Sequence, residues 1–267
     1  MLGGELEVRR LGFGAMRVTG DGIWGPPRDP DAARALLRHV VASGVTLVDT
    51  ADSYGPEVSE QLIAEALHPY PDGVVIATKG GWTRRGPGRW NADCRPERLR
   101  ECCEASLRRL RVDRIDLYQL HTVDPDVPIE ESLGALADLQ REGKIRHVGL
   151  SNVDVDELER GRRVVEVVSV QNRYNLGDRS SDPVLRACED AGIGFMPWAP
   201  LGHGRDATLD DVAHQVGATP AQVALAWLLC RSHAMLPIPG TSSREHFDEN
   251  MGAAAVRLSD SQFDALA

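Results

Sequence analysis

Residues 45–55 read VTLVDTADSYG, an apolar run that ends in an acid and continues into a polar loop. Two later stretches repeat this arrangement: VVIATK at 74–79 ends in Lys79, and IDLYQLH at 115–121 ends in His121. Short apolar runs of this kind are typical of buried parallel strands. The chain is therefore expected to contain a sheet whose strand ends carry titratable side chains.

Eight such strand-like segments are spaced along the 267 residues, with amphipathic helical patterns between them. Eight strands alternating with helices predict a parallel sheet, and right-handed crossovers can close eight units into a (β/α)8 TIM barrel. We expect a single α/β domain over residues 1–267. The predicted strands lie at 11–15, 46–48, 74–78, 115–120, 145–150, 167–171, 194–198 and 236–239. The predicted helices cover 30–43, 95–110, 129–141, 154–163, 183–191, 220–231 and 244–254.

The alternative architecture is an open doubly wound sheet, which carries a phosphate-binding glycine turn after its first strand. Gly12 and Gly14 begin such a turn, but Arg17 stands where the third glycine belongs. No acid-tipped second strand follows at the expected distance. The barrel is therefore favoured over the open sheet.

Charge and composition limit the partners. A formal net charge of -10 opposes nucleic-acid binding, which needs a concentrated basic face. No apolar run approaches the roughly 18 residues that cross a bilayer, and the opening MLGGELEVRR lacks the apolar stretch of a secretory signal. We expect a cytoplasmic protein without a membrane role.

The cysteines form no CxxC pair and are expected to be reduced thiols that hold no metal: Cys94, Cys102, Cys103, Cys188 and Cys230.

Four polar side chains are predicted to meet at one mouth of the barrel, because reactive groups lie where its strands end. Asp49, Lys79 and His121 end successive strands, and Tyr54 lies in the loop after the first of them. A buried lysine and a buried aspartate each need a partner, which they can supply to one another. The lysine charge is expected to lower the pKa of Tyr54 from about 10 toward the working pH. Tyr54 and a neutral His121 would then support the alkoxide formed when hydride adds to a carbonyl.

Each of these residues also has an ordinary structural interpretation. Taken alone, Asp49 suits a helix cap, Tyr54 a packing aromatic, Lys79 a solvated cation and His121 a hydrogen-bonded core histidine. Their occurrence together, each at or just beyond the end of a successive strand, is what favours catalysis.

Seven motifs resemble the aldo-keto reductase family, in order and over nearly the whole chain: DTADSYG, ATK, DLYQLH, IRHVGLSN, VQNRYN, PWAPLG and PIPGTSS. The resemblance implies an NAD(P)H-dependent oxidoreductase that reduces aldehydes or ketones to alcohols. It assigns Tyr54 as general acid, Lys79 and Asp49 as the groups that tune it, and His121 as the group that orients the carbonyl.

The resemblance also implies how the nicotinamide is held. Ser151, Asn152 and Gln171 match the family's contacts to the carboxamide, and Trp198 stands where a family tyrosine stacks on the nicotinamide ring. Pro200 and Leu201 follow in the same cofactor-binding turn. The alternative is that Asn152 caps a helix, Gln171 is a loop amide and Trp198 is a core aromatic.

A hydroxyl-rich turn, GTSS at 240–243, precedes the predicted helix 244–254, whose N-terminus favours a phosphate. The family often places lysine or arginine here to hold the 2'-phosphate of NADP, yet Gly240 and Ser242 occupy the commonest basic positions. We nevertheless expect NADPH to be preferred over NADH. The alternative is a plain helix-capping turn. The residues expected at the phosphate are Thr241, Ser242, Ser243, Arg244 and His246, and those expected at the adenine are Glu249 and Asn250.

The loop at 80–97 is long for a connection between strand and helix, and it carries Trp82, Trp90 and several arginines. With Trp24 on the same rim, these residues suit a planar, polar or anionic aldehyde. RLGFGAM, GPPRD and PIPGTSS are similar to the bacterial branch that contains pyridoxine 4-dehydrogenases, or pyridoxal reductases, so pyridoxal is a candidate substrate. The alternative is a solvated loop whose tryptophans pack down as lids. The connection at 201–206 is short, so no clamp over the cofactor pyrophosphate is expected.

Two other classes of function stay open. The same barrel serves some members of the family as a cofactor-sensing subunit with little turnover. A metal-dependent hydrolase or isomerase would use His121, Asp124 and Asp126, but their spacing resembles no known ligand set. The expected small-molecule partner is a carbonyl compound or an alcohol, and no metal is expected.

Overall fold

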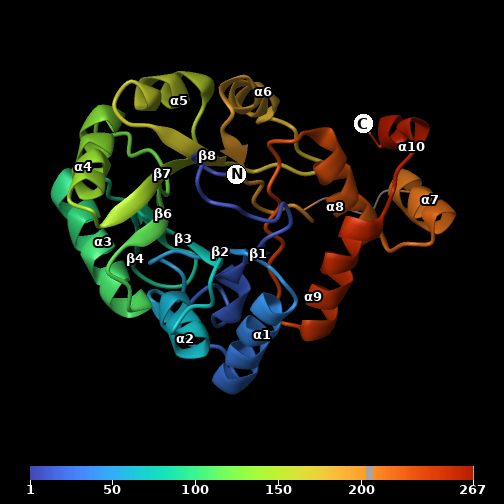
Figure 1. The fold of residues 1–267 in the computed structure, drawn as a ribbon, viewed down its shortest axis with the longest axis horizontal. Coiled ribbons are helices and arrows are strands. Elements are labelled where there is room, and N and C mark those ends of the chain that lie inside the picture. The colour runs from blue at the N-terminus through green and yellow to red at the C-terminus, as the bar shows by residue number, and fades with distance from the viewer. Residues whose placement is uncertain (203–206, 267) are drawn as a thin grey trace.

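The computed structural model describes residues 1–202 and 207–266. A parallel sheet of seven strands forms its centre, in the order β1-β2-β3-β6-β7-β8-β9. Figure 1 shows the strands curved around the middle of the molecule with helices on the outside. Each connection between consecutive strands of this sheet contains a helix, which is the α/β arrangement expected. The strands are β1 (Phe13–Gly14), β2 (Leu47–Asp49), β3 (Val75–Gly80), β6 (Ile115–Leu120), β7 (Ile145–Ser151), β8 (Val167–Gln171) and β9 (Gly194–Phe195).

Several helices begin at a residue whose side chain accepts a free backbone N–H group of the first turn. Asp29 caps α1 and Thr219 caps α8, each with a proline at the first turn, and Asp154 forms a capping box at α5. Such signals made most helices predictable. The helices are α1 (Pro30–Ala42), α2 (Val58–Leu67), α3 (Pro96–Leu110), α4 (Ile129–Arg141), α5 (Val155–Arg162), α6 (Asp182–Ala191), α7 (Ala207–Val216), α8 (Pro220–Arg231), α9 (Arg244–Met251) and α10 (Asp260–Ala265).

The strands separate two apolar clusters, one between the sheet and the helices and one inside the curve of the sheet. Along β3, Val75 and Ala77 belong to the inner cluster, whereas Ile76 belongs to the outer one. Side chains alternate between the two faces of a strand, so Lys79 continues the inner row. Leu47 and Asp49 on β2 follow the same rule, as do Leu117 and His121 on and after β6. The apolar floor of the inner face therefore ends in polar side chains.

The predicted strand at 236–239 is not a strand in the structure. Its backbone still bonds on both sides: Leu236 N–H donates to Phe195 O at 2.7 Å, and Gly12 N–H donates to Pro237 O at 2.9 Å. Pro237 and Pro239 have no N–H to donate, so a regular ladder cannot form along this segment. The predicted strands at 11–15 and 194–198 are also shorter than expected, since only Phe13–Gly14 and Gly194–Phe195 pair regularly.

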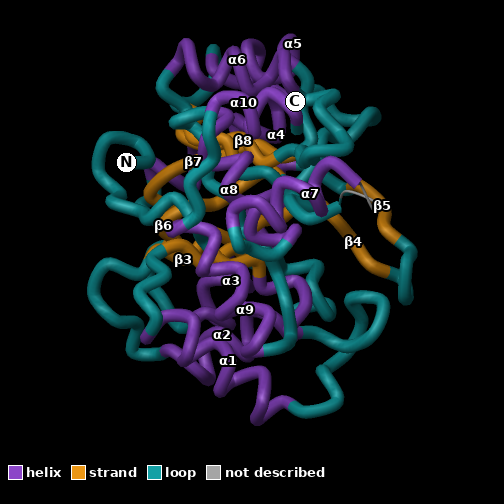
Figure 2. The backbone as a smooth tube through the Cα atoms, turned by 90° about the vertical axis from the view of Figure 1, so that its right-hand side faces the viewer, coloured by secondary structure: helices purple, strands orange, loops and turns teal. Residues whose placement is uncertain are grey.

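The helices α2, α7 and α10 lie outside the predicted helix ranges, and the loop predicted at 80–97 contains an antiparallel hairpin of β4 (Trp82–Arg84) and β5 (Trp90–Ala92). Helix α2 gave no sequence signal at its start, because Glu57 takes a left-handed backbone with φ 68° and makes no capping bond. The predicted helix 244–254 ends earlier, at Met251, and a short 3-10 turn follows. Figure 2 shows the hairpin extending from one side of the molecule.

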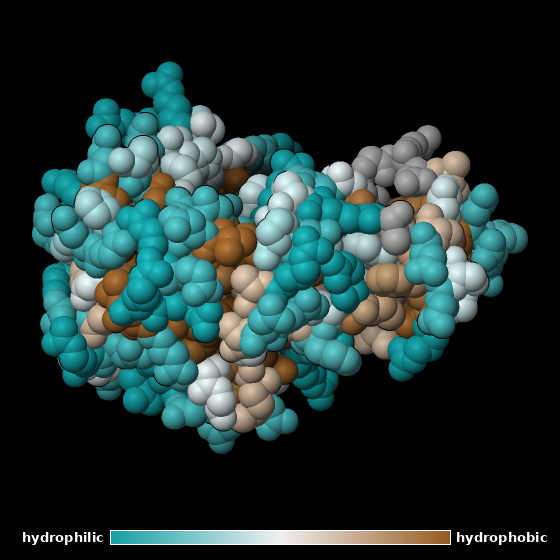
Figure 3. All heavy atoms as spheres, turned by 90° about the horizontal axis from the view of Figure 1, so that it is seen from above, coloured by the Kyte–Doolittle hydropathy of each residue, from teal (hydrophilic) through white to brown (hydrophobic). Residues whose placement is uncertain are grey.

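The described surface is largely polar on the face shown in Figure 3, where apolar side chains emerge only in patches. No helix in the two described ranges is both long and apolar enough to cross a membrane. All of the cysteines are free thiols, and only Cys230 is exposed.

Candidate functional site

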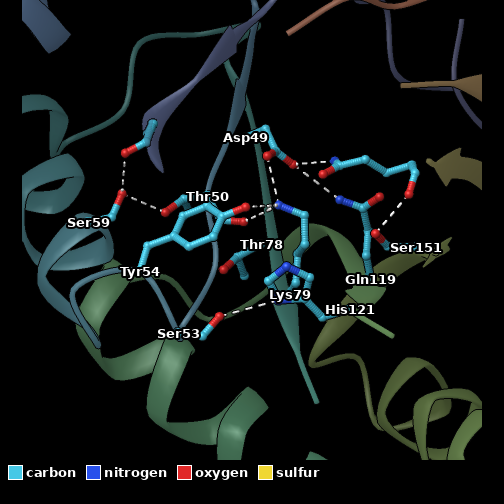
Figure 4. A network of polar contacts seen from close by, with 12 residues as sticks. Asp49, Thr50, Ser53, Tyr54, Ser59, Thr78, Lys79, Gln119, His121 and Ser151 are labelled. Carbon is cyan, nitrogen blue, oxygen red and sulfur yellow. Dashed lines mark hydrogen bonds and ion pairs between the residues drawn. The ribbon is translucent and has the colours of Figure 1, made fainter. Parts of the chain in front are cut away.

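The four side chains predicted to act together do meet at the ends of β2, β3 and β6. Asp49, Tyr54, Lys79 and His121 are all buried, with at most 7% of each residue exposed. Figure 4 shows Lys79 reaching between Asp49 and Tyr54, with His121 beside them. The predicted strand at 74–78 placed Lys79 one residue beyond its end. In the structure β3 extends to Gly80, so Lys79 lies within it. The strand order brings these groups together from segments as distant in the sequence as Asp49 and His121.

The Lys79 ammonium uses three donors on three acceptors. Its Nζ lies 2.7 Å from Asp49 Oδ2, 2.7 Å from Thr50 O and 3.4 Å from the Tyr54 hydroxyl. A lysine has three N–H groups to donate, so all of them are engaged. Full pairing explains how a charge can sit in a place with no exposed surface.

The second oxygen of Asp49 is held by neutral amides. Gln171 Nε2 donates to Oδ1 at 2.8 Å, and Gln119 Nε2 donates to the same atom at 3.3 Å. The sequence analysis missed Gln119, because a neutral amide has no titration signature. It stands two residues before His121 on β6, and this even spacing is the signal that would have found it.

The electrostatics differ from the sequence prediction at Tyr54. Burial raises the pKa of Tyr54 above its usual value, and the Lys79 charge offsets only part of this rise. The expected lowering of the pKa is therefore wrong for this structure, because the desolvation of a phenolate outweighs one nearby cation. The phenol keeps its proton, as a proton donor must.

The pKa values of Lys79 and His121 are shifted in opposite directions. Burial alone would lower the pKa of Lys79, but the Asp49 carboxylate and Tyr54 outweigh burial, so the pKa is raised and the ammonium persists. Burial first, and the Lys79 charge second, lower the pKa of His121 well below its usual value. The imidazole is therefore neutral. The Ser53 hydroxyl lies 3.3 Å from its Nδ1, and the Tyr54 and His121 rings meet edge to face at 5.8 Å between centroids.

A cavity of about 560 Å³ opens above these groups. Tyr54, Asp49 and His121 line it, whereas Lys79 lies behind them with no exposed surface. Two tryptophans of the hairpin form part of its wall. The other predicted site residues that line it are Ser151, Asn152, Gln171, Trp198, Pro200, Leu201 and Gly240. The cavity therefore joins the predicted catalytic and nicotinamide-binding residues in one space.

The predicted carboxamide contacts form a chain of hydrogen bonds. Trp198 Nε1 donates to Asn152 Oδ1 at 2.9 Å, and Asn152 Nδ2 donates to His121 O at 3.0 Å. The Ser151 hydroxyl donates to Gln171 O at 2.8 Å. Gln171 Oε1 accepts no hydrogen bond from the described residues, and Gln171 lines the cavity together with Trp198, so the cavity offers a free amide acceptor. These donors and acceptors fit a carboxamide and a flat heteroaromatic ring.

The GTSS turn has the structure of a helix cap. Ser243 accepts the His246 N–H at 3.2 Å, and its hydroxyl donates to Glu245 at 2.7 Å. The turn therefore caps helix α9, as the capping alternative predicted. Phosphate binding by the same turn stays a prediction. The side chain of Arg244 is 66% exposed, and it forms a 3.9 Å ion pair with Asp248.

A close backbone contact explains why glycine occupies position 240. A Cβ at Gly240 would lie 2.5 Å from Gly14 O, which no side chain can tolerate without a backbone shift. Lysine or arginine at position 240 would therefore require a backbone shift. Ser242 lines a neighbouring cavity rather than the main one. Glu249 offers its backbone carbonyl to Gln222, and Asn250 is buried within α9.

The structure separates the three predicted substrate tryptophans. Trp82 and Trp90 line the cavity, and the Trp82 ring packs edge to face against both Trp90 and His121. Trp24 does not line the cavity; it lies 5.5 Å from the guanidinium of Arg84. The short connection predicted at 201–206 falls partly outside the described residues, which end at 202 and resume at 207.

Asp124 and Asp126, which were considered as metal ligands together with His121, form a turn instead. Asp124 accepts the N–H groups of Cys94 and Asp126, each at 3.0 Å, so its carboxylate stabilises a turn. Within the described ranges, no three His, Cys, Asp or Glu side chains are grouped as metal ligands are.

Comparison with known proteins gives a consistent result. A sequence model of the Aldo/keto reductase family matches residues 10–206 and 205–267. The chain is 49% identical to an uncharacterised oxidoreductase of Schizosaccharomyces pombe, covering 98% of this chain and 87% of that protein. It is 43% identical to pyridoxine 4-dehydrogenase of Escherichia coli, covering 98% and 95%. A crystal structure of an aldo/keto reductase from Klebsiella pneumoniae in complex with NADP and acetate is similar with a TM-score of 0.83 at 28% identity, covering 99% of this chain and 92% of that one.

Proposed function

The chain belongs to the aldo/keto reductase family of oxidoreductases, and on this basis we propose that it reduces aldehydes or ketones to alcohols with NADPH, using Tyr54 as general acid. The observation that carries the proposal is the buried group of Asp49, Lys79 and Tyr54 at one end of the cavity. An ammonium held against a protonated phenol, beside a neutral imidazole, is the arrangement that proton donation to a carbonyl oxygen requires.

Tyr54 gives the proton in the proposed step. A hydride adds to the carbonyl carbon while the phenol O–H bond breaks and its proton passes to the carbonyl oxygen, so that C=O becomes CH–OH. The nicotinamide, when bound, supplies this hydride. The Lys79 ammonium stabilises the phenolate that is left, and Asp49 keeps the ammonium paired. Solvent then returns a proton to Tyr54.

His121 orients the carbonyl in this proposal. Nδ1 lies 3.3 Å from the Ser53 hydroxyl, and the proposal assigns the hydroxyl as donor to Nδ1, so that the proton of the neutral ring is on Nε2. That N–H donates to the carbonyl oxygen and strengthens as negative charge develops there. Because the imidazole is neutral, it does not compete with Tyr54 as the proton source.

The cofactor is proposed to lie along the cavity. Ser151, Asn152 and Gln171 hold the carboxamide, the Trp198 ring faces the nicotinamide, and Pro200 and Leu201 flank it. The turn at 240–243 holds the phosphate together with Arg244 and His246, and Glu249 and Asn250 contact the adenine. The preference for NADPH over NADH is supported by the exposed Arg244 guanidinium and by the NADP complex of the Klebsiella pneumoniae relative.

The substrate is proposed to be a planar aromatic aldehyde of the pyridoxal type. Two findings support it: Trp82 and Trp90 supply aromatic walls beside His121, and the pyridoxine 4-dehydrogenase of Escherichia coli is 43% identical. Aromatic walls favour flat rings through offset and edge-to-face contacts.

We also propose that the fold is a single (β/α)8 barrel over residues 1–267. Support comes from the segment at 236–239, whose backbone bonds to Phe195 in β9 on one side and to Gly12 and Gly14 at β1 on the other. A cytoplasmic location stays a prediction from the sequence.

The test mixes the purified protein with NADPH or NADH and a panel of aldehydes that includes pyridoxal and 4-nitrobenzaldehyde. Loss of nicotinamide absorbance with at least one aldehyde is the expected result. Cofactor binding without turnover would instead favour a cofactor-sensing subunit. If neither cofactor binds, the proposed function is wrong.

A further inference from the structure

Arg84, on strand β4, joins three segments that are distant in the sequence. Its Nη1 donates to Ser53 O at 2.9 Å and to Ile23 O at 3.0 Å, and its Nη2 donates to Gly22 O at 3.3 Å. The hairpin is thereby fastened to the loop after β1 and to the loop that carries Tyr54. Charge-assisted bonds to carbonyl oxygens are among the stronger hydrogen bonds in proteins.

The same guanidinium lies against aromatic rings. Its central carbon is 3.7 Å from the centroid of the Trp90 ring and 5.5 Å from that of Trp24. The Nε of Arg84 is buried and has no hydrogen-bond partner among the described residues. This is compatible with a guanidinium whose flat face packs against a ring. A planar guanidinium can stack on an indole and donate at its edge at once, which a lysine ammonium cannot do.

The ring that Arg84 holds is part of the cavity wall. Trp90 lines the main cavity and also a neighbouring cavity of about 730 Å³, so its indole stands between the two spaces. Trp82 comes from the same hairpin and packs against Trp90 and His121. The position of the hairpin therefore fixes the width of the space next to the catalytic histidine.

We propose that Arg84 is a positioning residue that sets substrate specificity: by clamping Trp90 and the hairpin, it maintains a narrow aromatic slot that selects planar aromatic aldehydes over flexible aliphatic ones. This inference rests on the proposed reductase function. Arg84 itself touches neither the reacting atoms nor the cofactor; it acts through Trp90.

The test compares Arg84→Ala with Arg85→Ala, which removes the same charge from an exposed neighbour on the same hairpin. With NADPH, we expect Arg84→Ala to raise the KM for 4-nitrobenzaldehyde and pyridoxal about tenfold, with kcat changed less than about threefold. The kcat/KM for butanal and the Kd for NADPH should stay within about twofold of wild type. Tenfold corresponds to about 1.4 kcal/mol, which lies within the range for one stacked and hydrogen-bonded guanidinium. Arg85→Ala should leave the ratio of aromatic to aliphatic kcat/KM unchanged.

Two further variants keep the test decisive. Arg84→Lys retains the charge but loses the planar stack, so it should show most of the loss. Trp90→Leu removes the wall without removing the bonds to Ser53, Ile23 and Gly22, and it should lower the same ratio even where Arg84→Ala does not fold. An unchanged ratio in Arg84→Ala or Trp90→Leu overturns the inference, as does an equal loss for butanal. Failure of the wild type to turn over any carbonyl would instead reject the proposed function itself.

Discussion

Lys79 Nζ lies 2.7 Å from Asp49 Oδ2, and neither side chain has more than 3% of its surface exposed. Burying two charges is costly unless they pair with each other. If one partner is removed, the other charge is left buried without a counterion. The third donor of Lys79 is directed at the hydroxyl of Tyr54, which agrees with the proposed role of the pair in stabilising the phenolate.

Asp49→Asn should destabilise the fold strongly, since the Lys79 charge then lacks its counterion. We expect a loss of about 3–5 kcal/mol in the free energy of unfolding, measured by urea titration at pH 7. Asp21→Asn is the matched control, because the ion pair of Asp21 with Arg28 is almost fully exposed and its loss should have little effect. A loss below about 1 kcal/mol for Asp49→Asn would show that Lys79 is not charged in the fold.

Asp52 makes stability depend on pH. Burial, and then Glu60, raise the pKa of this carboxyl from 3.8 to about 7, and Oδ1 has no hydrogen-bond partner among the described residues. A carboxyl whose pKa is higher in the folded than in the unfolded protein stabilises the fold fully at pH values below its unfolded pKa. This stabilisation is lost as the pH rises through the folded pKa of about 7. The advantage of Asp52→Asn over wild type should grow by roughly 2 kcal/mol between pH 5 and pH 8.

The measurement for Asp52 is urea unfolding of both proteins at several pH values. Asp72→Asn, at an exposed position, is the control and should give a difference that stays within about 0.5 kcal/mol. A flat difference for Asp52→Asn across this range would mean that the carboxyl is not desolvated in the fold.

Gly240→Ala tests the contact that excludes a side chain beside the cavity. The new Cβ would lie 2.5 Å from Gly14 O, so we expect a loss of about 1–3 kcal/mol in thermal or urea unfolding. Gly134→Ala, in α4 with nothing within 4 Å of the new Cβ, should instead stabilise the fold by up to about 1 kcal/mol. Equal effects of the two substitutions would contradict the steric account.

Arg244→Ala tests the proposed phosphate seat. Loss of a charge-assisted bond to the 2'-phosphate should raise the Kd for NADPH about tenfold and leave that for NADH unchanged. Binding is followed by fluorescence titration, with Arg38→Ala on the exposed side of α1 as the control. If the two Kd values change together, or not at all, Arg244 does not select the cofactor.

The positions of the candidate catalytic residues were predictable because strand alternation and strand order follow from the sequence pattern. Asp49, Lys79 and His121 each continue a row of apolar residues that faces inward, so their meeting follows once the strands are parallel. The α/β architecture and the amphipathic helices follow from the same periodic patterns.

Other features depend on the three-dimensional environment. The pKa of Tyr54 was predicted in the wrong direction, because the extent of burial cannot be read from residue type. No regular strand forms at 236–239, because Pro237 and Pro239 have no N–H group to donate to a ladder. Gln119 and Arg84 were missed as structural partners, since a neutral amide and one arginine among several give no signal before their neighbours are known.

The central claim, that Tyr54 gives the proton in carbonyl reduction, is tested most directly by Tyr54→Phe. The measurement is NADPH oxidation with 4-nitrobenzaldehyde in the variant and the wild type, with the Kd for NADPH measured alongside. We predict that kcat falls by about 10²–10⁴, while the Kd for NADPH stays within about twofold. A variant that binds NADPH normally and retains kcat within about threefold of the wild type would contradict the account.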